Sequence, residues 1–116
     1  MVVTIFHNPR CSKSRATLEL LQAKGITPRA VEYLKAPPSP AQLEEILRKL
    51  GMEDPRQLMR RQEPEYRQLS LDDPTLDRQA LLAAMAAHPR LIERPIVIAG
   101  ERAALGRPPE NVLEIL

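Results

Sequence analysis

The strongest indication of the fold of this 116-residue chain is near its start, in the segment Val2-Val3-Thr4-Ile5-Phe6-His7-Asn8-Pro9-Arg10-Cys11-Ser12. It begins with a run of apolar and β-branched residues, which favours a strand over 2–6. The strand pattern breaks at the turn-forming pair Asn8-Pro9, and a helical pattern begins near Ser12. Cys11, the only cysteine in the chain, is therefore predicted at the N-terminus of a helix that follows a strand.

The position of Cys11 indicates a nucleophile. Unpaired backbone N–H groups and the positive end of a helix dipole favour thiolate over thiol, and the thiolate is the form that attacks electrophiles. A single free cysteine in a globular protein is more often a small buried hydrophobic residue. The preceding turn, the neighbouring cations Arg10, Lys13 and Arg15, and the strand-to-helix switch point favour the reactive thiol.

The patterns around this segment predict a βαβ unit, then helices, then a β-hairpin and a final helix. The expected elements are a helix over 12–24 ended by Gly25, a strand over 28–34, helices beginning at Pro40, Pro55 and Asp77, strands over 95–99 and 102–105 joined by Gly100-Glu101, and a helix over 110–116. This order is that of a thioredoxin-like α/β fold, a mixed four-stranded sheet flanked by helices. We expect one domain over 1–116, with a helical insertion at about 39–88.

The overall composition excludes several classes of function. Seventeen Lys and Arg against 15 Asp and Glu give a net charge of only +2, too balanced to indicate nucleic-acid binding. One cysteine forms no internal disulfide, and neither a membrane-spanning run nor a signal-type stretch is found. We therefore expect a cytoplasmic protein with neither a nucleic-acid nor a membrane partner. Thirteen of the 17 cations are arginine, whose planar guanidinium suits bidentate binding of oxyanions.

Four short motifs follow one another along the chain, at His7–Arg15, Leu58–Arg61, Leu91–Val97 and Gly106–Leu113. Together they resemble the glutaredoxin-coupled arsenate reductase family, an ArsC-like branch of the thioredoxin-like superfamily, and the resemblance covers nearly the whole chain. The family also includes relatives that are not established arsenate reductases, among them the Spx-type transcriptional regulators.

The resemblance implies a catalytic set of one cysteine and three arginines. Cys11 matches the nucleophile that attacks the arsenic of arsenate. Arg60, Arg94 and Arg107 match the arginines that hold the oxyanion and the covalent intermediate. An X–Pro bond adopts the cis form at modest cost, and Pro95 resembles the thioredoxin-family cis-proline, so we predict a cis bond there.

The same resemblance implies supporting roles for the loop around the thiol. His7 matches a histidine that lowers the thiol pKa, and Ser14 matches a serine that hydrogen-bonds the thiolate. Asn8 and Arg15 belong to the same substrate-binding and pKa-tuning loop.

The resemblance also implies a reaction cycle. Cys11 forms a thioarsenate adduct, glutathione attacks it, arsenate is reduced to arsenite, and glutaredoxin removes glutathione from the resulting mixed disulfide. Position 14 is serine, so no Cys-x-x-Cys pair resolves the mixed disulfide internally. We expect no metal and no tightly bound cofactor, because His7 and His88 lack zinc-ligand spacing to Cys11. The expected partners are arsenate or another small oxyanion, glutathione as co-substrate and glutaredoxin, and we expect a monomer.

Two alternatives stay open at this point. A glutathione-dependent thiol reductase of unknown substrate would use the same fold and the same Cys11. Arg10 and Ser12-Lys13 differ from the Ala and Gly-Thr associated with the arsenic-resistance branch, which favours this alternative. A Spx-type regulator that binds RNA polymerase is less favoured, because such regulators often carry a Cys-x-x-Cys switch and generally lack the full arginine set.

Overall fold

The computed structural model describes residues 2–116, and the chain divides into two compact units. One, the sheet unit, contains the residues up to Ala36 together with Arg94–Leu116. The other, the helical unit, is Pro37–Glu93. The helical insertion predicted at about 39–88 thus falls within the helical unit. That the whole chain forms a single domain stays a prediction.

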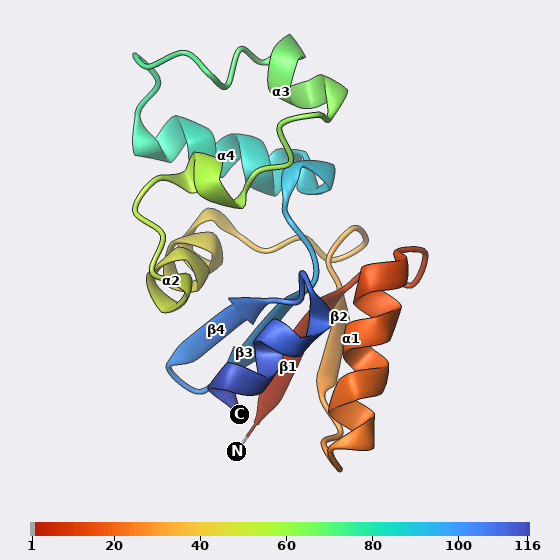
Figure 1. Cartoon of the computed structure of the whole chain (residues 1–116). Coiled ribbons are helices and arrows are strands. Elements are labelled where there is room, and N and C mark those ends of the chain that lie inside the picture. The colour runs from red at the N-terminus through yellow and green to blue at the C-terminus, as the bar shows by residue number, and fades with distance from the viewer. Residues whose placement is uncertain (1) are drawn as a thin grey trace. The chain divides into compact units, whose positions relative to one another are not determined.

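The sheet unit contains a mixed four-stranded sheet, as predicted (Figure 1). Its strands are β1 (Val3–His7), β2 (Arg29–Glu32), β3 (Ile96–Ala99) and β4 (Arg102–Leu105). The strand order is β2-β1-β3-β4, with β1 parallel to β2 and antiparallel to β3, and with β3 and β4 forming a hairpin. The side chains of β1 alternate between buried and partly buried, so one face of this strand packs inward.

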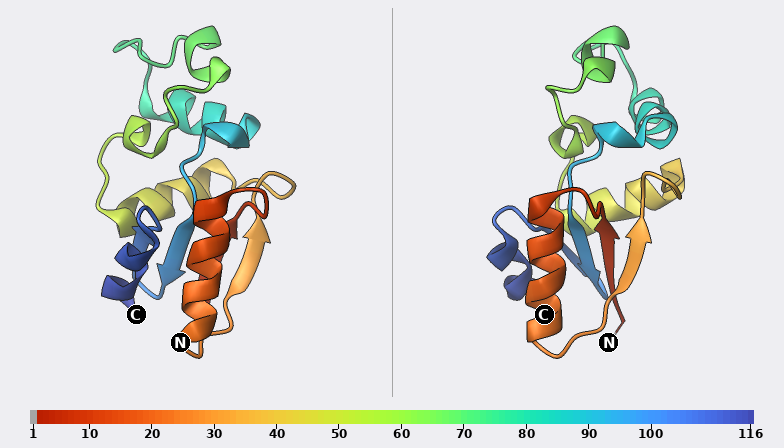
Figure 2. Two further views of the ribbon diagram at one scale, coloured as in Figure 1. Left: turned by 45° about the vertical axis from the view of Figure 1, so that its right-hand side comes forward. Right: turned by 90° about the vertical axis from the view of Figure 1, so that its right-hand side faces the viewer.

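Helix α1 (Ser12–Ala23) and the 3₁₀ helix η3 (Pro109–Ile115) cover the same face of this sheet (Figures 1 and 2). The core between them contains Val3, Ile5, Leu21, Val97, Ala99, Val112 and Ile115. Helix α1 ends where the sequence predicts, because Gly25 adopts the left-handed conformation with φ +78°.

The last helix differs from the prediction in its type and its buried residues. It is a 3₁₀ helix, in which residues three apart share a face, and its buried pair is Val112 and Ile115. Leu113 and Leu116, which an α-helical stripe would place on the sheet, are 36% and 40% exposed.

The helical unit contains three α-helices and two 3₁₀ helices (Figure 1). They are α2 (Pro40–Leu50), η1 (Pro55–Leu58), α3 (Pro64–Gln68), α4 (Arg78–Ala87) and η2 (Pro89–Leu91). Ser39 caps α2 through a capping box with Gln42, and Asp77 caps α4 by accepting a hydrogen bond from the backbone N–H of Ala80. The caps explain why both helices begin where predicted.

The helical unit has its own apolar core. Helix α2 packs against α4, and the fully buried side chains include Leu43, Leu47, Leu58, Leu81, Leu82, Met85 and Leu91. The ion pair of Arg78 with Glu44 also joins the two helices, with Nε 2.8 Å from Oε1. Within residues 2–116, every helix is too short or too polar to cross a membrane.

Candidate active site

Cys11 is the N-cap residue of α1, in the position that the sequence predicts. Its backbone is extended, its carbonyl accepts the first helical hydrogen bond from Arg15 N–H at 3.0 Å, and its side chain is half-buried. A turn delivers it there, because Cys11 N–H donates to the Asn8 carbonyl at 3.0 Å and Arg10 N–H donates to Asn8 Oδ1 at 3.0 Å. Asn8 therefore shapes the loop with both of its oxygens.

The surroundings of the Cys11 sulfur lower its pKa. Partial burial, the largest single influence, raises the pKa, but the backbone N–H groups of Ser14 and Lys13 and the charges of Arg94 and Arg107 outweigh it. Arg107 Nη2 lies 3.9 Å from Sγ. The thiolate is thus favoured by both the helix end and the guanidinium groups.

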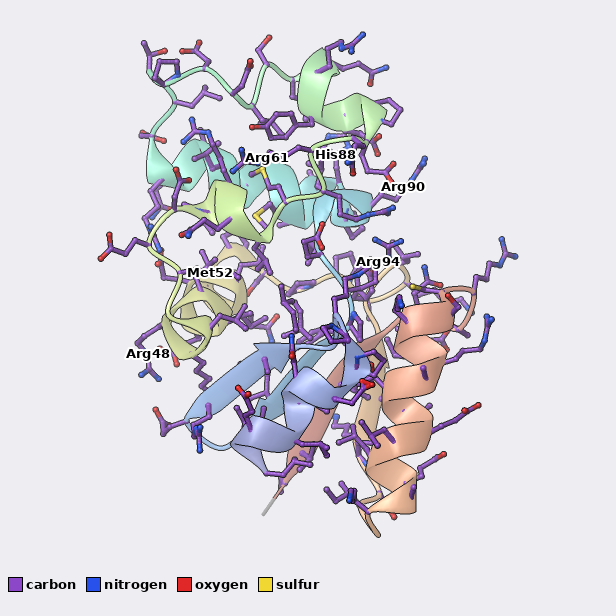
Figure 3. The ribbon with its side chains drawn as sticks, in the orientation of Figure 1. Arg48, Met52, Arg61, His88, Arg90 and Arg94 are labelled. Carbon is purple, nitrogen blue, oxygen red and sulfur yellow. The ribbon has the colours of Figure 1, made fainter. Side chains whose placement is uncertain are left out.

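The side chain of Arg107 is hydrogen-bonded to the backbone of Arg94, which is labelled in Figure 3. Arg107 Nε donates to the Arg94 carbonyl at 2.8 Å, and Asn111 Nδ2 donates to the Arg107 carbonyl at 3.0 Å. Arg94 Nε is buried and has no hydrogen-bond partner among the described residues. The Arg94–Pro95 bond is cis, which confirms the prediction, and Arg107–Pro108 is a second cis bond that the sequence analysis missed.

His7 and Ser14 form a buried polar pair behind the cysteine loop. His7 Nδ1 lies 2.6 Å from Ser14 Oγ, which also accepts a hydrogen bond from Asn8 N–H at 3.0 Å. Burial, outweighing the opposite effect of Glu32, lowers the pKa of His7, so the imidazole is neutral at neutral pH. The group of Ser14 that stabilises the sulfur is its backbone N–H, while its hydroxyl binds the loop. The predicted action of the two side chains on the thiolate stays a prediction.

The other two predicted residues have different surroundings. Arg15 Nη1 donates to the Pro9 carbonyl at 2.9 Å, so this arginine fastens the loop that precedes Cys11. Arg60 belongs to the helical unit, where its Nη1 lies 2.7 Å from Glu63 Oε1. Glu63 also pairs with Arg90 at 3.1 Å. The sheet unit therefore brings together the other seven predicted residues, and the role of Arg60 stays a prediction.

Two further residues support the position of Arg107. Thr17, which is fully buried, donates from Oγ1 to the Lys13 carbonyl at 2.8 Å and lies 3.5 Å from the Gly106 carbonyl. A Cβ on Gly106 would lie 2.7 Å from Pro95 Cγ and even closer to Thr17 Oγ1. Only glycine lets the backbone before Arg107 pack this closely. Neither residue carried a sequence signal beyond the position of Gly106 next to Arg107.

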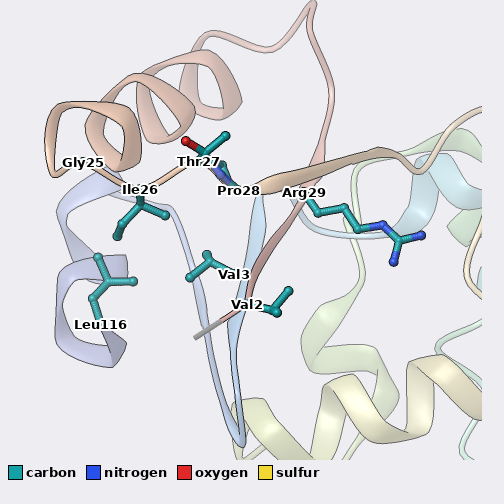
Figure 4. Close-up of a pocket in the computed structure, with 8 residues that line it drawn as sticks. All are labelled: Val2, Val3, Gly25, Ile26, Thr27, Pro28, Arg29 and Leu116. Carbon is teal, nitrogen blue, oxygen red and sulfur yellow. The ribbon is translucent and has the colours of Figure 1, made fainter.

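At the opposite end of β1 from Cys11, a cavity of about 510 Å³ is lined by Val2, Val3, Gly25, Ile26, Thr27, Pro28, Arg29 and Leu116 (Figure 4). Within residues 2–116, no group of three or more His, Cys, Asp or Glu residues is arranged to hold a metal ion.

The fold and the site together define a thioredoxin-like protein with one activated thiol. Comparison with known proteins then gives the family: the profile of the ArsC family matches residues 6–115, and the chain belongs to this family. The chain is 52% identical to an arsenate reductase of Neisseria meningitidis serogroup A over 114 residues, which cover 98% of this chain and 97% of that protein. It is also 52% identical to an arsenate reductase of Haemophilus influenzae over 116 residues, the full length of both.

A solved structure gives the same result. The structure of an arsenate reductase from Vibrio cholerae superimposes with a TM-score of 0.97 at 52% identity, covering 100% of this chain and 98% of that chain. The family resemblance found in the sequence and the thioredoxin-like fold are thereby confirmed.

Proposed function

We propose that this protein is an arsenate reductase that uses glutathione and glutaredoxin. The observation that carries the proposal is the Cys11 sulfur, whose pKa is lowered at a helix N-terminus and which lies 3.9 Å from Arg107 Nη2. The names of the Neisseria and Haemophilus relatives support arsenate as the substrate.

The charges fit an oxyanion substrate. Arsenate is an anion at neutral pH, so a thiolate approaches it only if fixed cations and N–H donors offset the repulsion. Arg94 and Arg107 supply such cations beside the sulfur, and the buried Nε of Arg94 is a donor without a partner among the described residues. Arg60 is the third oxyanion-binding arginine in this proposal, on the strength of the motif at 58–61.

The proposed cycle transfers two electrons from two thiols to arsenic. The Cys11 thiolate attacks arsenic, an S–As bond forms, and an oxygen leaves as water. The glutathione thiolate then attacks the Cys11 sulfur, an S–S bond forms, and the S–As electron pair passes to arsenic, which leaves as arsenite. Glutaredoxin thiolate attacks the glutathione sulfur of the mixed disulfide and releases the Cys11 thiolate.

The proposal also assigns the setting of this reaction. The protein acts as a monomer without a bound metal or other cofactor, and glutathione is its co-substrate. The cycle needs reduced thiols, so we place the protein in the cytoplasm.

One observation favours a second candidate, a glutathione-dependent thiol reductase acting on another substrate. The residues that flank the thiol, Arg10 and Ser12-Lys13, differ from those of the arsenic-resistance branch. This candidate keeps the steps at Cys11 and changes only the electrophile.

A turnover assay tests the proposal. Purified protein with arsenate, glutathione and glutaredoxin should produce arsenite, and Cys11→Ser should abolish production. Omitting glutaredoxin should stop the reaction after the mixed disulfide forms. Wild-type protein that makes no arsenite, although its thiol still reacts with iodoacetamide, would overturn the assignment and favour the second candidate.

A further inference from the structure

A second cavity lies beside the cysteine loop, with a volume of about 260 Å³. We call it the β2-side cavity; its lining residues are His7, Asn8, Pro9, Arg10, Glu32, Leu34 and Lys35. We propose that it binds glutathione and presents the thiol of that tripeptide to the Cys11 sulfur. This inference rests on the proposed function and adds the location of its reductant.

The sheet topology separates the cavity from the arginines. Strand β1 leads into Cys11 and has β2 on one side and β3 on the other. Arg94 immediately precedes Pro95 and β3, and Arg107 follows β4, so both come from the β3 side. Glu32 ends β2, pairs with His7 in register, and lines the cavity. The two groups of residues thus flank the cysteine loop from opposite edges.

The reaction requires this separation. A thiolate that displaces a group from sulfur approaches in line with the bond that breaks, from the side opposite the leaving group. In the proposed cycle the leaving group is arsenic, held by Arg94 and Arg107. Glutathione must therefore reach the Cys11 sulfur from the other side, which is the side of the β2-side cavity.

The charges of the cavity match those of the tripeptide. Glutathione carries two carboxylates and one ammonium group at neutral pH, and the cavity presents two cations, Arg10 and Lys35, and one carboxylate, Glu32. Lys35 Nζ lies 3.6 Å from Glu32 Oε1 and its side chain is 80% exposed. An exposed pair of this kind is weak, so both groups are free to turn toward a ligand.

The position of the cavity also fits, because its lining includes Arg10, the residue that precedes Cys11. Leu34, which is 41% exposed, adds an apolar surface for the methylene groups of the ligand.

The test uses the rate at which Cys11 reacts with two disulfides, oxidised glutathione and the uncharged 2-hydroxyethyl disulfide. Lys35→Glu should slow the reaction with oxidised glutathione about tenfold, because an attractive charge becomes repulsive, and should leave the uncharged disulfide unaffected. Arg29→Glu is the control, since it makes the same charge change at the opposite end of β2, where Arg29 lines the other cavity (Figure 4).

Equal rates for Lys35→Glu and wild type with oxidised glutathione would overturn the inference. Equal slowing by Arg29→Glu would overturn it too, because general charge attraction would then explain the effect. The assay contains no arsenate, so its result is separate from the turnover assay. In the turnover assay itself, Lys35→Glu should raise the KM for glutathione and leave the KM for arsenate unchanged.

Discussion

At the scale of single residues, the ionisation of Cys11 results from opposing influences on one sulfur. Partial burial disfavours the thiolate, and two backbone N–H groups and two guanidinium groups favour it more strongly. His7 is not among these influences, because its pKa is lowered and its contact is with Ser14. Fixed dipoles and permanent cations therefore explain the lowered pKa of the thiol, and an action of His7 on it stays a prediction.

Gly106 provides a residue-scale prediction. Gly106→Ala adds a Cβ that meets Pro95 Cγ at 2.7 Å, together with the side chain of Thr17. We expect a loss of about 1–3 kcal/mol in the free energy of unfolding, the usual cost of overpacking. We also expect a raised thiol pKa, because the backbone before Arg107 must shift. Chemical denaturation and the pH dependence of thiol alkylation measure the two effects.

Thr17→Ala supplies the control for that variant. The double variant lacks one of the two obstructing side chains, so its thiol pKa should lie closer to the wild-type value than that of Gly106→Ala. Thr17→Ala alone should change the thiol pKa little. A Gly106→Ala protein with wild-type stability and thiol pKa would contradict this account of the glycine.

The sequence predicts the position of Cys11 but not the contacts around it. Cys11 at a helix N-terminus follows from local pattern, because strand, turn and helix signals all lie within a few residues. The pairing of His7 with Ser14, and of Thr17 with Gly106, could not be predicted. These contacts depend on side-chain packing across the fold, for which single-sequence patterns carry no signal.

At the scale of secondary structure elements, prediction works where capping and periodicity agree. Helix α2 has a capping box at Ser39, a proline at its first position and a left-handed Gly51 at its end, and it begins at Pro40, as predicted. Helix α3 has no buried residue and therefore no apolar stripe, so the sequence analysis missed it. The short 3₁₀ helix η2 was missed because three residues are too few for a periodic pattern.

At the scale of the whole molecule, the residues that the sequence predicts for the site belong to two units of the chain. The sheet unit holds Cys11, Arg94 and Arg107, and the helical unit holds Arg60. The order of elements predicted the sheet, because the strands and their connections have clear signals. The role of Arg60 stays a prediction, since single-sequence patterns carry no signal for tertiary structure between distant segments.

Arg60 gives a prediction at this scale. Arg60→Ala should lower kcat/KM for arsenate about 100-fold, as expected when one oxyanion-binding donor is lost. The free energy of unfolding should change by about 1 kcal/mol or less, because Glu63 keeps its ion pair with Arg90. Steady-state kinetics and chemical denaturation give the two numbers.

Arg61→Ala is the matched control, since Arg61 is the exposed neighbour in the same helical unit (Figure 3). Equal loss of activity and stability in Arg60→Ala would show a structural role for Arg60 instead. An Arg61→Ala protein with the same loss of activity would show that the effect is not specific to Arg60, which would also contradict the prediction.

The most direct test of an activated Cys11 is the pKa of its thiol. This pKa is measured as the pH midpoint of alkylation by iodoacetamide. Burial alone would raise this pKa, so a midpoint below the ordinary thiol value of about 8.5 requires the helix N–H groups and the arginines. Removing a nearby positive charge disfavours the thiolate, so Arg107→Ala should raise the midpoint, and Arg102→Ala, at the exposed first residue of β4, should not. We predict a lowered wild-type midpoint that rises in Arg107→Ala; a wild-type midpoint at or above the ordinary value would contradict the activation of Cys11.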